Sequence, residues 1–350
     1  MRSFSTEFLQ NIEVPVGTSW LLGSCMEARG KQDLWLKTRP DVLKALREIA
    51  VIQSAESSNR IEGVTVERAR LIPLLERKIR PRDRSEEEVF GYRKALDWIH
   101  SKHASIEITP ATIRHLHFLA QSGFSGDAGA WKKKSNKIIE IQVDGRRAVR
   151  FIPVSPKETP AAMKETCLGY KHAGQSSLLP DALAIASFTL DFLCVHPFRD
   201  GNGRVSRLLS LLLLYQCGYQ VGRFISLERI IESTKEEYYE ALRQSSVGWH
   251  EGKHDPIPYW NYFLRCLKEA YSELSSRVSM QEAHSGGSSE LIRKNILAQH
   301  SAFTLAEITE QFKSSSNQLV RKVLYQLKSE RKVKLVGRGR GARWRVLKDK

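Results

Sequence analysis

Twelve consecutive residues, His196 to Arg207, combine side chains that could perform chemistry on a phosphate compound. They read His-Pro-Phe-Arg-Asp-Gly-Asn-Gly-Arg-Val-Ser-Arg. His196 has the only side chain among them whose ordinary pKa suits accepting a proton near neutral pH. Asp200 suits a hard cation such as Mg²⁺, and Arg204 and Arg207 could hold different phosphates. This combination predicts a site for a polyphosphate and its metal ion.

Two apolar segments flank this cluster, and both are expected to be helices. Residues 182–195 are almost wholly apolar and too long for a typical strand, so they predict a buried helix that ends before Pro197. The glycines of residues 201–203 permit a tight turn, and a second apolar helix opens at Arg204. Free N–H groups at such a helix start bind anions. The alternative is a structural turn whose arginines only neutralise helix ends.

The twelve residues resemble the signature of Fic-domain proteins, His-Pro-Phe-x-Asp/Glu-Gly-Asn-Gly-Arg-x-x-Arg, and all nine specified residues are present. The similarity extends over roughly residues 113–264. The resemblance implies a protein adenylyltransferase, which transfers AMP from ATP to a Ser, Thr or Tyr hydroxyl of a target protein or of itself. It implies His196 as the catalytic base, Asp200 as the Mg²⁺ ligand, and ATP-binding roles for Gly201, Asn202, Gly203, Arg204, Arg207 and Tyr239. Relatives that phosphorylate have a lysine at the position of Gly203, so this glycine favours AMP transfer.

A short upstream motif, Ser58 to Gly63, resembles the inhibitory motif of Fic proteins. A helix is expected over about residues 41–61, with Gly63 as its stop. The helix dipole disfavours a carboxylate such as Glu62 at this end unless a cation compensates it. The resemblance implies that Glu62 pairs with Arg207 at the γ-phosphate position and keeps the enzyme inhibited. Removal of AMP with the help of this glutamate stays open, and an ordinary surface helix end is the alternative.

Two further segments have expected roles next to the nucleotide. Residues 139–153 alternate around Asp144-Gly145, which predicts two short strands and a tight turn. In Fic proteins a hairpin flap docks the target protein by strand addition, whereas a plain edge hairpin is the alternative. Residues 233–239 predict a capped helix start. The resemblance places Tyr239 against adenine, and a core tyrosine is the alternative.

The composition indicates a mainly helical protein of two or three domains, 350 residues long with a net charge of +16. The longest leucine run is too short to span a bilayer, and the N-terminus lacks an apolar signal core. Five scattered cysteines fit reduced thiols. We therefore expect a cytoplasmic protein without membrane contact. The expected domains are an N-terminal helical region with the inhibitory helix (1–110), a Fic-type helical bundle with a β-hairpin flap (111–284), a flexible linker (285–289) and a C-terminal domain (290–350).

The C-terminal domain is strongly basic. Residues 290–350 contain 15 Lys and Arg against 5 Asp and Glu. Helix patterns over 290–300, from a capping Thr304, and over 317–330 precede a hairpin pattern over 333–346 with a basic tip, an order that resembles a winged helix-turn-helix. The candidate DNA contacts are Arg321, Lys322, Arg338 and Arg340. The alternative is a module for protein contacts or dimerisation.

Two functions compete at this point. The first is an adenylyltransferase that uses ATP and Mg²⁺, inhibited by its own Glu62. The second is a DNA-binding transcriptional regulator whose Fic domain senses nucleotide or modifies only its own chain. His196 favours the enzyme, because a nucleotide sensor would need the arginines and the turn but no base. A homodimer is left open, since some Fic proteins bury the inhibitory region between subunits.

Overall fold

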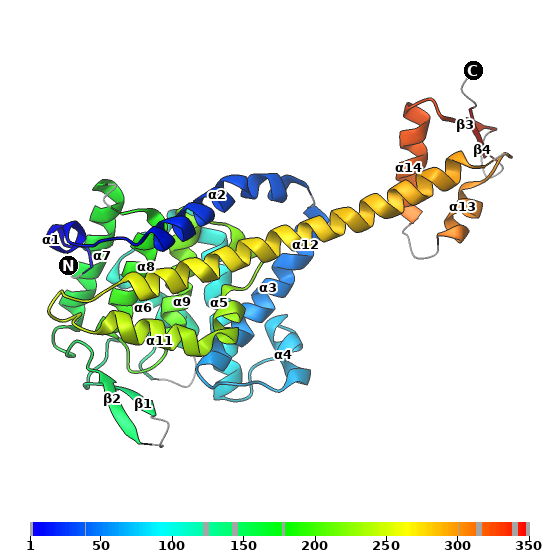
Figure 1. Ribbon diagram of the computed structural model, residues 1–350. Helices are drawn as coiled ribbons and strands as arrows, with labels where there is room; N and C mark the ends of the chain where they lie inside the picture. Colours follow the sequence, from blue (N-terminus) through cyan, green and yellow to red (C-terminus); the bar gives the residue numbers. More distant parts are fainter. Residues whose placement is uncertain are drawn as a thin grey trace. The chain divides into compact units, whose positions relative to one another are not determined.

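The computed structural model describes residues 3–38, 40–121, 126–141, 146–176, 179–299, 301–312, 317–337 and 342–347 (Figure 1). The chain divides into two compact units, residues 1–275 and 276–350. In the described part the protein is mainly helical and has two small two-stranded sheets. Among the helices of this part, none has both the length and the apolar character needed to cross a membrane.

The first unit contains a helical bundle and one hairpin. In chain order its elements are α1 (Thr6–Gln10), α2 (Val16–Thr38), α3 (Pro40–Ile61), α4 (Arg68–Leu75), α5 (Arg84–Lys102), α6 (Pro110–Gln121), β1 (Ile138–Ile141), β2 (Arg147–Phe151), α7 (Thr159–Ser176), α8 (Asp181–Val195), α9 (Asn202–Gln216), α10 (Leu227–Ser233), α11 (Lys235–Ser246) and the first part of α12 (Ile257–Leu297).

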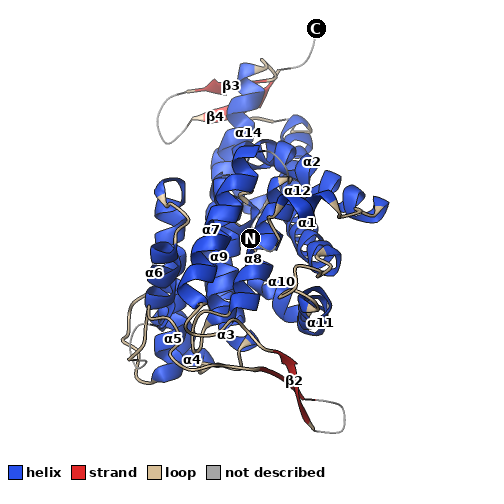
Figure 2. Cartoon of the chain, turned by 90° about the vertical axis from the view of Figure 1, so that its left-hand side faces the viewer, coloured by secondary structure: helices blue, strands red, loops and turns tan. Residues whose placement is uncertain are grey.

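Helices α8 and α9 form the centre of this unit. Every residue of α8 after Asp181 is buried, which confirms the buried helix predicted over residues 182–195. α8 packs against α7 and α9, and α9 also contacts α5 and α6 (Figure 2). The loop between α8 and α9 therefore starts and ends on the most buried helices of the unit. This arrangement gives the twelve-residue motif a rigid base.

The predicted hairpin forms a two-stranded antiparallel sheet that extends from the helices (Figures 1 and 2). Ile139 pairs with Val149, and Ile141 pairs with Arg147. Both strands lie within the predicted range of 139–153, apart from Ile138 at the start of β1. The predicted turn at Asp144-Gly145 lies outside the described residues.

The second unit packs the end of α12 with α13 (Leu305–Gln311), α14 (Asn317–Ser329), β3 (Val333–Val336) and β4 (Arg343–Val346). Its core includes Ile292, Ile296, Phe303, Ile308, Val320, Val323, Leu324, Leu327, Val333 and Trp344. Thr304 caps α13 through a capping box with Glu307, as the sequence predicts. Phe303 bridges to Trp344 beside the hairpin. Arg321 and Lys322 are exposed on α14, whereas Arg338 and Arg340 lie outside the described residues.

The predicted flexible linker over residues 285–289 is wrong, because α12 runs through these residues as one helix. The helix predicted over 290–300 is the end of the same helix, which stops at Leu297. Glycine and serine inside a helix cost no more than about 1 kcal/mol each relative to alanine, and helical segments flank them on both sides. The division between the two units falls earlier, between Ser275 and Ser276.

Candidate nucleotide site

His196 caps the C-terminal end of α8 in a left-handed conformation, with φ 50° and ψ 61°. Its backbone N–H donates to the Phe192 carbonyl at 2.9 Å. Its Nδ1 lies 3.3 Å from the Leu193 carbonyl oxygen, which can only accept, so Nδ1 carries the proton and Nε2 is left as an acceptor. Burial, and then the positive charge of Lys132, lower the pKa of His196 to about 4. The imidazole is therefore neutral at pH 7 and able to take a proton.

Lys132 binds the backbone at the start of the loop between α8 and α9. Its Nζ donates to the Val195 carbonyl at 3.1 Å and to Asn136 Oδ1 at 3.0 Å, and its backbone N–H donates to the Pro197 carbonyl at 2.9 Å. The side chain is buried, and this burial lowers its pKa to about 8. Nothing in the sequence marks Lys132, because its role depends on a loop more than sixty residues away.

The Asn202 side chain binds the backbone in the middle of the loop. Its Oδ1 accepts from the Phe198 N–H at 2.9 Å, and its Nδ2 donates to the Phe198 carbonyl at 2.8 Å. The Phe198 ring is fully buried and stacks on His117 with 3.8 Å between centroids. His117 Nδ1 accepts from the Gly129 N–H, so its Nε2 donates to the Asp200 carbonyl. The Asn202 side chain thus shapes the loop from inside.

Gly201 and Gly203 bring the backbone at the start of α9 close to other chain segments. Gly201 has φ 78°, and a Cβ at this position would collide with Gln121 Nε2. A Cβ on Gly203 would collide with Glu62 Oε1. The first N–H groups of α9 have no partner within the helix and form an anion-binding end. The carboxylate of Glu62 therefore lies directly against this end of the helix.

Arg207 makes the contact that the sequence predicts. Its Nε donates to Ser58 Oγ at 2.9 Å, and its Nη2 donates to the Ser58 carbonyl at 2.9 Å and to Glu62 Oε1 at 2.7 Å. Within the described part of the chain, its buried Nη1 has no hydrogen-bond partner. Burial works to lower the pKa of Arg207, but the charge of Glu62, its hydrogen bond to Arg207 and the nearby Tyr238 and Tyr92 together outweigh burial, so the pKa is raised. Gly63, with φ 81°, ends the α3 segment as expected.

Arg204 faces the protein interior. Its Nη1 donates to Glu88 Oε2 at 2.6 Å and to Asn59 Oδ1 at 3.3 Å. Neither Arg204 nor Arg207 is among the residues that line the cavity described below, although the resemblance implies that both contact phosphates. The sequence does not predict Glu88 and Asn59 as partners of Arg204, because acidic and amide residues on helices are most often solvent-exposed.

Asp200 is exposed at the other edge of the loop. Its Oδ2 accepts from Arg84 Nη2 at 2.9 Å, and its Oδ1 lies 3.6 Å from Arg204 Nη2. Over the described ranges, no group of three or more His, Cys, Asp and Glu side chains could hold a metal by itself. A single carboxylate beside an anion-binding helix end still fits Mg²⁺, which commonly binds one or two carboxylates and completes its shell with phosphate oxygens and water.

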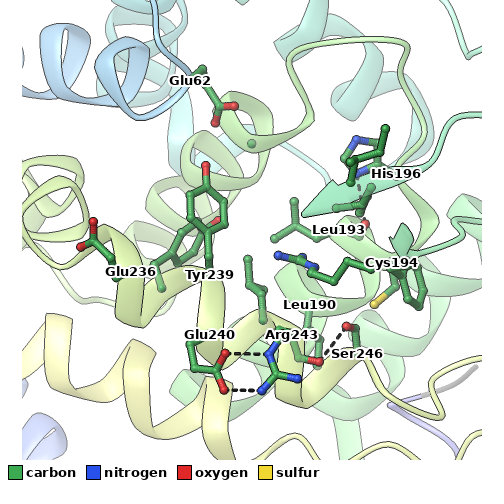
Figure 3. A pocket seen from close by; sticks show the side chains of 17 residues that line it. Glu62, Leu190, Leu193, Cys194, His196, Glu236, Tyr239, Glu240, Arg243 and Ser246 are labelled. Carbon is green, nitrogen blue, oxygen red and sulfur yellow. Dashed lines mark hydrogen bonds and ion pairs between the residues drawn. The ribbon is translucent and has the colours of Figure 1, made fainter. Parts of the chain in front are cut away.

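A cavity of about 600 Å³ opens between the loop, the hairpin and α11 (Figure 3). Glu62, His196, Gly203 and Tyr239 all line it. The remaining lining residues are Ile138, Ile139, Arg150, Phe151, Leu190, Leu193, Cys194, Glu236, Tyr238, Glu240, Leu242, Arg243 and Ser246. Figure 3 shows Tyr239 below Glu62, with the ion pair of Glu240 and Arg243 farther along the wall. The cavity thus joins a base, an anion-binding helix end and an aromatic side chain.

Comparison with known proteins agrees with this geometry. The profile of the Fic/DOC family matches residues 107–214, the range that contains His196, the glycine turn and both arginines. This match covers less than half of the chain. The curated relatives of the chain are distant. The protein adenylyltransferase Fic of Drosophila erecta is 27% identical over 252 residues, which cover 68% of this chain and 46% of the relative. That of Nematostella vectensis is 26% identical over 235 residues, with 64% and 48% covered. The chain spans about half the length of these relatives.

Solved structures show the same fold. A Fic domain containing signaling protein from Bacteroides thetaiotaomicron matches with a TM-score of 0.62 at 22% identity, covering 73% of this chain and 97% of that one. A Fic family protein from Desulfovibrio desulfuricans G20 matches with a TM-score of 0.61 at 16% identity, covering 97% and 98%. The helical Fic-like fold is therefore established for this chain.

Proposed function

We propose that this protein is an adenylyltransferase that transfers AMP from ATP to a hydroxyl group of a target protein or of its own chain. The observation that carries the proposal is that His196 and Gly203, at the anion-binding end of α9, line one cavity. His196 is neutral at pH 7 and has Nε2 free to accept. A base beside a phosphate-binding helix end is what hydroxyl attack on a phosphate requires.

In the proposed reaction His196 Nε2 takes the proton of the acceptor hydroxyl as its oxygen attacks the α-phosphate. The bond from the α-phosphorus to the bridging oxygen breaks, and pyrophosphate leaves. The N–H groups at the start of α9 and the Arg207 guanidinium would hold the phosphates, and Asp200 would hold Mg²⁺ after exchanging its contact with Arg84. Bound there, Mg²⁺ would neutralise charge on the phosphates. Tyr239 lines the cavity where it could stack on the base.

We also propose that Glu62 inhibits this reaction. Its carboxylate lies against Gly203 and pairs with Arg207, so a negative charge already occupies the anion position that a phosphate of ATP needs. A phosphate entering this position would meet both steric overlap and charge repulsion. Glu62 must therefore move before the nucleotide can bind in a reactive pose.

The decisive experiment labels ATP at the α-phosphate or at the γ-phosphate and follows the label into protein. We expect label from α-ATP only, increased by Glu62→Gly and lost with His196→Ala, which should still bind ATP. Label from γ-ATP would show a kinase. Transfer that survives His196→Ala would overturn the assignment of the base. Self-modification and a cell lysate serve as the two sources of acceptor.

A second candidate function, DNA binding by residues 290–350, is favoured by α14. Arg321, Lys322 and Lys328 are exposed on this helix together with Tyr325, and the order of elements fits a winged helix-turn-helix. We expect duplex DNA to bind with an affinity that falls steeply with salt. A gel shift with Arg321→Glu and Lys322→Glu tests this, and binding that the double variant leaves unchanged would contradict it.

A further inference from the structure

A hollow of about 430 Å³ on the first unit lies apart from the nucleotide cavity. Its lining residues come from α2, α3, the residues that follow α9 and a single-turn 3-10 helix, His103–Ser105. The two spaces share no lining residue. Arg47 at the hollow and Glu62 at the nucleotide cavity are fifteen residues apart, about 22 Å along the direction of α3. The hollow is therefore a separate candidate site, and its volume is that of a small-molecule pocket.

The charge around this hollow is of one sign. Of the described residues that line it, Lys44, Arg47 and Arg223 are cationic, and none is acidic. Lys44 and Arg47 are exposed and lie three residues apart on α3, hence on the same side of the helix. Arg223 is half-buried. Three cations around one hollow without an acidic residue favour an anionic ligand.

Neutral groups hold Arg223 in place in the described structure. Its Nε donates to Gln220 Oε1 at 2.5 Å, and its Nη1 donates to the His100 carbonyl at 3.2 Å. Its Nη2 donates to His103 Nδ1 at 3.1 Å, and the guanidinium lies over the Tyr215 ring, 4.7 Å from the centroid. These bonds use three of its five N–H groups, which leaves one hydrogen on each Nη for a further acceptor. The guanidinium is thus oriented before any ligand binds.

Arg47 is the second guanidinium at this hollow. It lies over the Phe224 ring, 5.5 Å from the centroid, which favours this position of the side chain. Burial lowers the pKa of Arg223, the Tyr215 phenol opposes this, and the positive charge of Arg47 adds to it. The two arginines therefore repel each other in the folded protein, and an anion bound to both would relieve the repulsion.

We propose that this hollow binds an organic phosphate, a small molecule that carries one phosphate group and an apolar part. Arg47 and Arg223 would hold the phosphate, because the N–H groups of a guanidinium match phosphate oxygens in pairs. Lys44 would add a third positive charge. The apolar part would pack against Leu36 and Leu43, the aliphatic residues of the lining. This inference is independent of the proposed chemistry at His196.

Isothermal titration calorimetry of the full chain with phenyl phosphate tests the class of ligand. Inorganic phosphate lacks the apolar part, and benzoate has the ring with a carboxylate in place of the phosphate. We expect phenyl phosphate to bind at least about tenfold more tightly than either of them, because it alone uses both the guanidiniums and the aliphatic wall. No binding of phenyl phosphate at millimolar concentration, or equal binding of either comparison ligand, would overturn the proposal.

Substitutions locate the site. Arg47→Gln should weaken phenyl phosphate binding at least about tenfold, and it should fold because Arg47 is exposed. Arg223→Gln should weaken binding as much, with its fold checked by circular dichroism. Arg265→Gln is the matched control, since Arg265 is an exposed arginine on α12 that lines neither space. It should leave the affinity unchanged.

Two outcomes of this series would contradict the proposal. Binding that Arg47→Gln leaves unchanged would lie elsewhere, the nucleotide cavity included. Equal losses in Arg47→Gln and Arg265→Gln would show a general attraction of phosphate to a basic chain instead of a site.

Discussion

Two neighbouring arginines of α9 are held in different ways. Arg204 and Arg207 lie three residues apart, and their side chains are 1% and 3% exposed. Arg204 pairs with Glu88 of α5, whose side chain is 5% exposed. Arg207 pairs with Glu62, which follows α3 and is 29% exposed at the cavity wall. One pair is enclosed by protein, and the other opens to the space where a ligand would enter.

We therefore expect the pair of Arg204 and Glu88 to be structural, whereas a ligand could replace Glu62 as the partner of Arg207. Removing one member of a buried pair leaves a charge without compensation, which is strongly destabilising. Where the removed member is itself partly exposed, as Glu62 is, the loss of stability is smaller, because water or another anion can take its place beside the buried arginine. The pair of Arg204 and Glu88 should therefore control whether the loop folds. The pair of Arg207 and Glu62 should control whether the nucleotide binds productively.

The largest expected effect is on the pair of Arg204 and Glu88. Glu88→Gln should lower the free energy of unfolding by about 3 kcal/mol or more, because Arg204 stays charged and buried. Urea unfolding measures this, and Glu87→Gln is the matched control, since Glu87 is the preceding residue on α5 and is only half-buried. A loss no greater than that of the control would mean that Arg204 does not depend on this carboxylate.

For the pair of Arg207 and Glu62 we expect a change in rate more than in stability. Glu62→Gly should raise AMP transfer at least tenfold, because it frees the anion position, and should lower the free energy of unfolding by less than Glu88→Gln does, because water can reach the place of the lost carboxylate. Glu56→Ala is the control, since it removes a carboxylate of α3 that pairs with Arg60 and not with Arg207. Equal rates for both variants would contradict inhibition by Glu62.

The same contrast explains how far the sequence alone could lead. The pairing of Glu62 with Arg207 was predicted, because the motif and the resemblance name both residues. The partners of Arg204 were not, since Glu88 and Asn59 come close to it only after α3, α5 and α9 have packed. The helix α8 was predicted closely, because its residues are almost all apolar. The prediction of a linker over residues 285–289 was wrong, because Gly and Ser disfavour a helix only weakly and the helical segments on both sides continue through them.

A smaller effect should follow from Ser58→Ala. Ser58 Oγ accepts from Arg207 Nε, so its loss removes one of the bonds that hold the guanidinium toward Glu62. We expect about 1 kcal/mol less stability and a rate increase well below that of Glu62→Gly. Ser54→Ala removes a hydroxyl from the same helix that donates to Glu228, so it should cost similar stability without activation. Activation by both variants would point to general loosening of α3.

The smallest expected effect is on the pH dependence of the free energy of unfolding. It tests whether the contact of His117 with the Asp200 carbonyl holds the loop in place. Burial lowers the pKa of His117 to about 4 in the folded protein, while an unfolded histidine titrates near 6.5. Between these values the unfolded chain binds more protons, so stability is complete above about pH 6.5 and falls as the pH drops toward 4. His117→Gln should reduce this slope by at most about 1.4 kcal/mol per pH unit, as measured by urea unfolding at several pH values.

Because His196 has a similarly lowered pKa, a residual slope should persist in the variant. Identical slopes in variant and wild type would mean that His117 is free to protonate, and that the contact between its ring and the Asp200 carbonyl does not hold the loop.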